Sequence, residues 1–239
     1  MIVVRSALFA AALLVVTLPY AVLSVLTFPL SRMVRFRVIS GWSRIMLCVA
    51  RRVCGLDYRV EGRENLPARP CVILSKHQSA WETLAFQTVF PPQVHVLKRE
   101  LLWIPFFGWG LAMMSPIAID RAKGRTALRQ LARLGKERIF QGFWVVIFPE
   151  GTRVAPGTRR RYQPGGAWLA VQTEAPVVPV AHNAGLYWPK NAFLKRPGTI
   201  TMRIGPAIPT AGRNPAEVTA EVERWIERQQ EELCPAIGN

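Results

Sequence analysis

The sequence predicts an α/β protein whose mixed, largely parallel sheet is flanked by helices, with a membrane-embedded helical segment at the N-terminus. Two observations lead to this fold class. After residue 57, short β-branched runs alternate with longer stretches that carry apolar residues at helical spacing, a pattern typical of a sheet covered by helices. Before that point, no charged residue occurs from Ser6 to Ser31. We therefore divide the 239 residues into a membrane-anchoring helical region, residues 1–57, and an α/β domain, residues 58–239.

The uncharged N-terminal stretch is long enough to cross a bilayer. As a helix, residues 6–31 would measure roughly 39 Å, which exceeds the ~30 Å hydrocarbon core. A cleaved secretory leader is one alternative, but the apolar part is too long and no clean small-residue cleavage site follows it. Pro19 and Pro29 leave open a kinked or shallowly inserted helix, and an interfacial hairpin with the next segment is a further alternative.

The arginines around this stretch predict its orientation. Arg5 alone precedes it, whereas a cluster follows it: Arg32, Arg35, Arg37, Arg44, Arg51 and Arg52. The positive-inside bias places the body of the protein on the cytoplasmic face, of the inner membrane in a bacterium, with the cluster against phospholipid headgroups. Within this region, residues 38–50 are too short to span and contain Trp42, so they predict an interfacial helix.

The remaining chain is a series of predicted strands and helices. The predicted strands are 71–75, 94–97, 117–119, 144–148, 177–180 and 199–204. The predicted helices are 81–90, 126–140 and 218–233. Ligands of such folds collect at the carboxyl ends of the strands. His77 and the segment 150–153 both fall there, each just after a predicted strand.

Charge and cysteine content narrow the class of partner. The net charge is +16, from 31 basic and 15 acidic residues, and no zinc-finger spacing or RNP-type motif accompanies it. An anionic bilayer and a phosphate-bearing substrate explain this sign, so we expect no nucleic acid. The cysteines form no CxxC pair and no metal-ligand spacing with the three histidines, which predicts no metal site and a reducing compartment. Cys48 and Cys71 lie in apolar runs and are predicted to be core residues.

A histidine and a carboxylate occur together in the segment Lys76-His77-Gln78-Ser79-Ala80-Trp81-Glu82. A neutral His77 could deprotonate an alcohol, while Glu82 would hold the required tautomer and stabilise the imidazolium. This pairing requires His77 in the turn before the helix and Glu82 in the first turns of the helix. No separate nucleophile is evident, and Ser79 is predicted to cap the helix. The alternative is a surface histidine near an unrelated glutamate.

The segment Phe148-Pro149-Glu150-Gly151-Thr152-Arg153 places a glycine turn, a hydroxyl and a guanidinium after an apolar run. Phosphate is often held in this way. The alternative is a turn with a solvated charge, but Lys98 and Arg121 follow two other strands and add basic residues at the same edge. A base beside a phosphate-binding loop, behind a membrane-length segment, indicates an enzyme that acts on a phosphorylated lipid.

Four blocks of the sequence resemble the 1-acylglycerol-3-phosphate O-acyltransferases, the lysophosphatidic acid acyltransferases of the glycerophospholipid acyltransferase family. They occur in the family's order within residues 60–185. The first block usually reads Asn-His-x4-Asp, and here Lys76 and Glu82 replace the asparagine and the aspartate. The other blocks are Lys98-Arg99-Glu100-Leu101 with Ile104–Gly110 and Ile119-Asp120-Arg121, then Phe148–Arg153, then Val178-Pro179-Val180.

The resemblance implies a reaction and a set of site residues. An acyl group would pass from an acyl-CoA or acyl-carrier-protein thioester to the free hydroxyl of 1-acylglycerol 3-phosphate, giving phosphatidic acid in phospholipid biosynthesis. Thioester cleavage drives this transfer, so no metal or redox cofactor is expected. His77 and Glu82 would be catalytic, and Arg153 would contact the phosphate. The implied substrate-binding residues are Lys98, Arg121, Glu150, Gly151, Thr152 and Arg153.

Two other functions stay open at this point. The changes at positions 76 and 82 leave the lysolipid in question, so the acceptor could be another lysolipid or an amino-acid lipid. A catalytically silent lipid-binding protein is the alternative from another class. Of the other histidines, His95 is predicted to be structural, and His182 could line the pocket. The aromatic residues Phe106, Phe107 and Trp109 are predicted to lie in the core or against the membrane.

Overall fold

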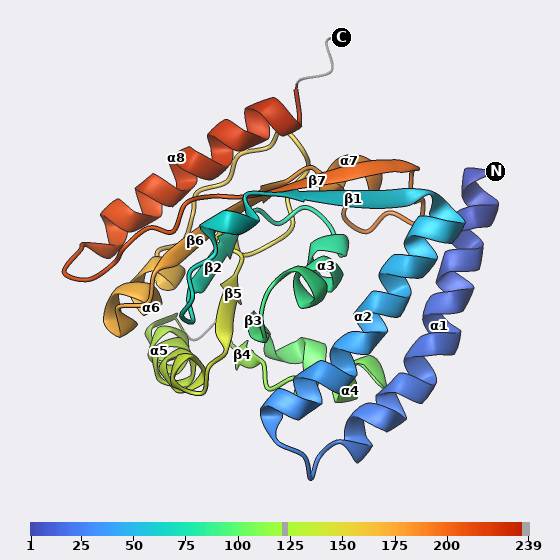
Figure 1. Ribbon diagram of the computed structural model, residues 1–239, viewed down its shortest axis with the longest axis horizontal. Coiled ribbons are helices and arrows are strands. Elements are labelled where there is room, and N and C mark those ends of the chain that lie inside the picture. Colours follow the sequence, from blue (N-terminus) through green and yellow to red (C-terminus); the bar gives the residue numbers. More distant parts are fainter. Residues whose placement is uncertain (121–123, 236–239) are drawn as a thin grey trace.

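The computed structural model describes residues 1–120 and 124–235, and a single sheet lies at its centre (Figure 1). The sheet has seven strands in the order β1-β7-β6-β2-β5-β3-β4. All neighbouring strands are parallel except β6 and β7, so the predicted mixed, largely parallel sheet is confirmed. The strands are β1 Leu56–Glu61, β2 Val72–Ser75, β3 Gln93–Lys98, β4 Ile117–Ile119, β5 Trp144–Ile147, β6 Val177–His182 and β7 Gly198–Ile204.

Helices cover both faces of the sheet. They are α1 Ile2–Leu26, α2 Arg32–Cys54, α3 Trp81–Val89, α4 Phe107–Met113, α5 Gly124–Phe140, α6 Gly165–Thr173, α7 Ala184–Tyr187 and α8 Pro215–Leu233. Two short 3-10 helices, η1 Arg63–Asn65 and η2 Arg99–Trp103, complete the described elements. Helices α5, α6 and α8 lie on one face, whereas α2 and α3 lie on the other (Figure 1).

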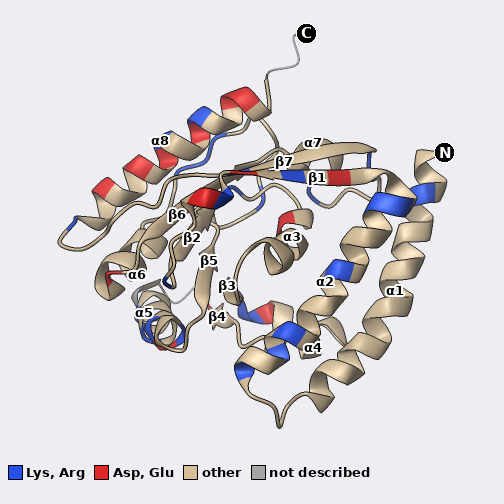
Figure 2. Ribbon diagram, in the orientation of Figure 1, with Lys and Arg blue, Asp and Glu red and all other residues tan. Residues whose placement is uncertain are grey.

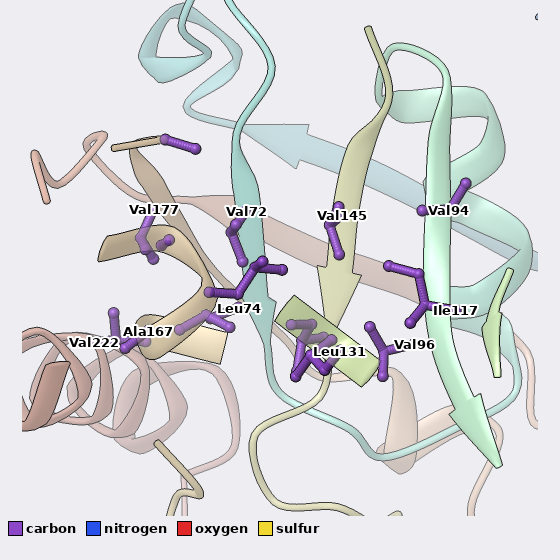
Figure 3. Close-up of a cluster of buried hydrophobic side chains, with 14 of the residues drawn as sticks. Val72, Leu74, Val94, Val96, Ile117, Leu131, Val145, Ala167, Val177 and Val222 are labelled. Carbon is purple, nitrogen blue, oxygen red and sulfur yellow. The ribbon is translucent and has the colours of Figure 1, made fainter. Parts of the chain in front are cut away.

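The central strands explain this two-sided covering. Every residue of β2 and of β5 is buried, as expected for parallel strands that are packed on both faces. Successive side chains point to opposite faces, so Val72 and Leu74 join one hydrophobic cluster while Ile73 joins the other. Figure 3 shows the first cluster, in which side chains of β2 and β5 meet Leu131 of α5 and Val222 of α8.

The N-terminal region folds as two packed helices, α1 and α2, which run antiparallel (Figure 1). The indole Nε1 of Trp42 donates to Thr17 Oγ1 at 3.2 Å across this contact. The described residues contain one helix that is long and apolar enough to cross a bilayer, α1, and only 17% of its most apolar window is buried. Leu14 and Val15, for example, are 67% and 70% exposed. Such an exposed apolar surface suggests membrane association.

Two expectations for this region need correction. The interfacial helix predicted over residues 38–50 is longer, because Ser31 caps its start and Gly55 adopts a left-handed conformation (φ 66°) at its end. The arginines between these caps lie on a helix that is otherwise half-buried, so they do not interrupt it. Cys48 was predicted to be a core residue but is exposed on α2, whereas Cys71 is buried.

Candidate active site

The carboxyl ends of the parallel strands β2, β5 and β3 meet at one edge of the sheet, and those predicted site residues that the structure describes gather there. His77 lies in the loop that follows β2, and Glu82 lies in the first turn of α3. The Nδ1 atom of His77 is 2.7 Å from Glu82 Oε1. The predicted placement, with histidine before the helix and glutamate in its first turn, is therefore the one observed.

The loop after β2 wraps around the Glu82 carboxylate. Oε1 accepts hydrogen bonds from the backbone N–H groups of Gln78 at 3.0 Å and Ser79 at 2.9 Å. Although burial alone would raise the pKa of Glu82, the neighbouring His182 and His77 rings and the Ser79 amide lower it below its usual value. An ionised Glu82 accepts a hydrogen bond from Nδ1–H, which leaves the lone pair of the His77 imidazole on Nε2.

The Ser79 hydroxyl acts at the start of α3. Its Oγ accepts a hydrogen bond from the Trp81 backbone N–H at 3.1 Å, which satisfies one of the free amides at the helix N-terminus. Ser79 is itself fully buried and its hydroxyl is committed to this contact. This geometry agrees with a capping role.

The segment after β5 makes three contacts with His77. The imidazole stacks on Phe148 with ring centroids 3.9 Å apart. The His77 backbone N–H donates to Glu150 Oε2 at 2.8 Å, and the His77 carbonyl accepts from the Val154 N–H at 2.8 Å. The imidazole is only 15% exposed, and within the described residues no protein group bonds to its Nε2. The one nitrogen left open is therefore the basic one.

The second predicted motif forms a turn next to this imidazole. Gly151 has φ 73°, a conformation that side-chain-bearing residues rarely adopt, and its N–H bonds to the Phe148 carbonyl at 3.0 Å. Thr152 and Arg153 are partly exposed, and no described residue pairs with the Arg153 guanidinium. Lys98 is exposed at the end of β3, the strand beside β5. Arg121, the other predicted phosphate contact, lies outside the described residues.

Glu150, which is predicted to bind substrate, is buried beside His77. It is 1% exposed, and its carboxylate lies between two protein groups, the Lys76 ammonium at 2.8 Å and the His77 backbone N–H. Burial raises the pKa of Glu150 to about 7, even with Lys76 beside it. In this structure the Glu150 carboxyl therefore faces protein groups, and its contact with substrate stays a prediction.

Lys76, the residue in the usual place of asparagine, is also buried, at 1% exposure. Its ammonium points away from the imidazole and contacts Glu150 Oε1 and Glu227 Oε1, each at 2.8 Å. These two carboxylates therefore offset the positive charge that Lys76 places next to His77 in the sequence. Glu227 was not predicted from the sequence. Its position next to the apolar Ile226 on the predicted helix is the signal that could have indicated a buried charge.

The two other histidines are held in neutral form. His182 is fully buried at the end of β6, its Nε2 bonds to the Lys76 carbonyl at 3.0 Å, and burial lowers its pKa. It also lies 4.0 Å from Glu82 Oε2, so it backs the carboxylate without reaching solvent. His95 stacks behind Phe148 within β3, and burial lowers its pKa to about 4. This placement agrees with a structural His95.

An exposed apolar surface lies near the site. Trp103, Phe106 and Trp109, in η2 and around the start of α4, are 68%, 40% and 46% exposed. Helix α4, which carries part of this aromatic surface, packs against α1 (Figure 1). Of the two predicted locations for these aromatics, the core is excluded.

An imidazole–carboxylate pair with an open basic nitrogen, set at the carboxyl edge of a largely parallel sheet beside a cationic turn, defines an enzyme that activates a hydroxyl group for transfer. The family model for acyltransferases matches residues 57–183. A 1-acyl-sn-glycerol-3-phosphate acyltransferase of Pseudomonas aeruginosa is 49% identical over 205 residues, covering 84% of this chain and 80% of its own length. The chain therefore belongs to the 1-acyl-sn-glycerol-3-phosphate acyltransferase family.

More distant proteins agree with this assignment. The human 1-acyl-sn-glycerol-3-phosphate acyltransferase beta is 36% identical over 173 residues, which cover 71% of this chain and 62% of the human protein. The crystal structure of the 1-acyl-sn-glycerophosphate (LPA) acyltransferase PlsC from Thermotoga maritima shares the fold, with a TM-score of 0.81 over 100% of this chain and 98% of that one. At 23% identity, that likeness bears on the fold alone.

Proposed function

We propose that this chain acylates 1-acylglycerol 3-phosphate to phosphatidic acid, with His77 as the general base. The observation that carries the proposal is the contact between His77 Nδ1 and the buried Glu82 carboxylate, which leaves Nε2 open. In this mechanism, Nε2 removes the proton of the acceptor hydroxyl while its oxygen attacks the thioester carbonyl carbon. The carbon–sulfur bond then breaks, and the leaving thiolate takes the proton back from the imidazolium. Glu82 stabilises the imidazolium in between.

The acceptor phosphate is proposed to bind at the turn after β5. Arg153 follows the left-handed Gly151, is partly exposed and has no partner among the described residues. The Val154 N–H contacts the His77 carbonyl at 2.8 Å, so the backbone of this turn is fixed next to the base. A phosphate on Arg153 and Thr152, with Lys98 nearby, would hold the glycerol hydroxyl close to Nε2. Arg121 is proposed as a further phosphate contact on its sequence position alone.

The acyl donor and the location of the enzyme belong to the same proposal. The donor is an acyl-CoA or an acyl-carrier-protein thioester, and the transfer needs no metal or redox cofactor because thioester cleavage drives it. The apolar face of α1 and the aromatic surface of α4 contact membrane phospholipids. The acceptor, 1-acylglycerol 3-phosphate, and the product, phosphatidic acid, reside in the same membrane. The arginines that follow α1 favour the cytoplasmic face, of the inner membrane in a bacterium.

The test is an acyl-transfer assay with the purified full-length chain. It compares 1-acylglycerol 3-phosphate with other lysolipids, an amino-acid lipid and a monoacylglycerol, each with both donor types. We expect phosphatidic acid as the main product, and a loss of about 10²-fold or more in kcat for His77→Ala. The control is His95→Ala, a half-buried histidine that stacks on Phe148 and whose ring nitrogens the mechanism does not use.

Three outcomes would contradict the proposal. Faster transfer to another acceptor would move the substrate to that lipid. Binding of lysolipid with no transfer from either donor would leave a silent lipid-binding protein. A folded His77→Ala variant with near wild-type turnover would remove His77 from the mechanism.

A further inference from the structure

The C-terminal helix α8 is joined to the loop that carries His77 by two separate side-chain connections. Helix α8 covers the face of the sheet opposite to α3, the helix that carries Glu82 (Figure 1). It also lies outside residues 57–183, the part of the chain that the acyltransferase family model matches. Its hydrophobic residues, such as Val222 and Ile226, account for its packing. They do not account for Glu227 and Gln230, which are polar and buried on the same helix.

The first connection is a chain of charged groups. Glu227 Oε1 contacts the Lys76 ammonium at 2.8 Å, and the same ammonium contacts Glu150 Oε1 at 2.8 Å. The other Glu150 oxygen accepts the backbone N–H of His77, also at 2.8 Å. Three contacts therefore lead from α8 to the backbone of the proposed base.

Three further residues contact this chain of charged groups. The Lys76 ammonium also donates to the Thr158 carbonyl at 3.2 Å, and the Tyr162 hydroxyl donates to Glu227 Oε1 at 2.9 Å. Arg159, which is largely exposed, adds a longer contact of 3.8 Å to the second oxygen of Glu227. A buried ammonium with two hydrogen-bond acceptors and an ion pair with Glu150 has one favourable position, and so does the Glu150 carboxylate beside it.

The second connection is a chain of amides. The Gln78 amide nitrogen donates to Gln230 Oε1 at 2.6 Å, and the Gln230 amide nitrogen donates to the His182 carbonyl at 3.0 Å. Gln78 also accepts the Gly185 N–H at 3.1 Å through its own oxygen. Because the Gln78 backbone N–H bonds to Glu82, this chain ends on the carboxylate partner of His77.

We propose that Glu227 and Gln230 of α8 are positioning residues for His77, Glu227 through Lys76 and Glu150, and Gln230 through Gln78. The proposal rests on the proposed function of His77. Its physical basis is that a buried charge which loses its partner must move or recruit another. Without Glu227, the ammonium is left with Glu150 and one carbonyl, and Glu150 turns from the His77 N–H toward it. The imidazole then no longer holds its alignment with the acceptor hydroxyl, to which proton transfer is sensitive.

The test compares Glu227→Gln with a matched control, Ile226→Ala, in the full-length chain. Both residues are adjacent on α8 and buried, but Ile226 belongs to the hydrophobic cluster and contacts no polar group of the loop. We expect Glu227→Gln to lower kcat about 10-fold and to change the KM for acceptor and donor less than about 2-fold. Ile226→Ala should lower Tm at least as much and leave kcat within about 2-fold. Gln230→Met, which keeps length without the amide, should also lower kcat severalfold.

A double-mutant cycle tests the route through Lys76. If Glu227 acts through that ammonium, Glu227→Gln should cost no further kcat in a Lys76→Met background. Additive losses, or a kcat that follows Tm equally in Glu227→Gln and Ile226→Ala, would overturn the proposal. His77→Ala is measured in the same assay. An active His77→Ala refutes the proposed function, whereas an inactive His77→Ala beside a fully active Glu227→Gln refutes only the positioning role.

Discussion

At the scale of single residues, the site separates charges that serve chemistry from charges that serve structure. Glu82 is buried, but backbone amides and two histidine rings keep its pKa low, so it stays an anion beside His77. Glu150 is buried to a similar degree, but burial raises its pKa to about 7 although the Lys76 ammonium beside it acts in the opposite direction. Two buried glutamates that both contact His77 therefore have different protonation behaviour, and only their surroundings decide it.

The role of Glu82 can be tested by changing its charge and its length separately. Glu82→Gln keeps an oxygen for the amides of Gln78 and Ser79 but loses the charge that stabilises the imidazolium. Glu82→Asp keeps the charge and shortens the side chain by one methylene. We therefore expect kcat to fall much more in Glu82→Gln than in Glu82→Asp. Full activity in the glutamine variant would show that Glu82 is only a helix residue.

Arg153 is the residue whose substitution should separate substrate binding from chemistry. Arg153→Ala should raise the KM for 1-acylglycerol 3-phosphate strongly and the KM for the donor little, because the guanidinium contacts the acceptor phosphate. Arg153→Lys should restore part of the affinity, since an ammonium keeps the charge but not the two-pronged geometry. A monoacylglycerol, which lacks the phosphate, should be a poor acceptor that is nearly indifferent to the change. If wild type uses it equally well, Arg153 is not a phosphate ligand.

Glu150 predicts how stability should depend on pH. Its usual pKa of 4.5 is raised to about 7 in the folded chain, so the folded state holds a proton more tightly than the unfolded state does. The stability from this group is therefore fully present below pH 4.5 and is lost as pH rises through about 7. Lys76, Glu227, Tyr162 and Arg159 face the same cluster, so the comparison must be made within one background.

Glu150→Gln removes this titration and keeps an acceptor for the His77 N–H. We expect the Tm difference between wild type and Glu150→Gln to shift against wild type as pH rises from 4.5 to 7.5. Thermal unfolding at a series of pH values measures it, with Glu137→Gln as the exposed control whose pKa is lowered rather than raised. A difference that is constant over this range would show that Glu150 is ionised throughout.

At the scale of elements, the sequence predicts best those elements whose signal is local. The strand 144–147 and the helix 81–89 were predicted almost to their ends, because apolar runs and the proline pair at 91–92 define them. Helices α4 and α6 were not predicted, since both contain two glycines and are stabilised by packing rather than by propensity. Strand β1 was also missed, because its alternating charged residues suit an edge strand that pairs only with β7.

The same distinction applies to the site. His77, Glu82 and Arg153 were predicted because their motifs are local in sequence and their strand ends share an edge. Glu227 and Gln230 were not, because their contacts to the loop span 151 and 152 residues. Nothing near position 76 indicates where a buried ammonium finds its counter-charges. The contacts of Glu150 with Lys76 and the His77 N–H could not be predicted for a related reason, since a motif gives residue types but not the direction in which each side chain points.

At the scale of the whole molecule, α1 and α8 differ in how they carry charge. Figure 2 shows that α1 carries charge only near its N-terminal end, whereas α8 carries charged residues along its length. Helix α4 packs against α1, and α8 lies across the sheet from both (Figure 1). If α1 embeds in the bilayer, burial of its apolar face outweighs the attraction of arginines to headgroups.

This predicts that membrane binding depends on the apolar face of α1 and not on net charge alone. The double variant Leu14→Glu/Leu18→Glu places two carboxylates on that face, where both leucines are exposed, and lowers the net charge from +16 to +14. Arg228→Glu on the exposed side of α8 lowers it equally and is the matched control. Because a carboxylate in the hydrocarbon region costs on the order of 2–3 kcal/mol, the double variant should shift strongly to the soluble fraction.

The control variant should bind membranes as the wild type does. High salt should release neither of these two proteins, because salt screens headgroup attraction but leaves apolar burial intact. Flotation with vesicles of mixed anionic and zwitterionic lipid measures all three proteins at low and high salt. Circular dichroism of the double variant excludes unfolding as the cause of its release, since both substituted positions face away from α2. Quantitative salt extraction of the wild type, or equal release of the double variant and Arg228→Glu, would show that charge holds the chain at the membrane and that α1 does not embed.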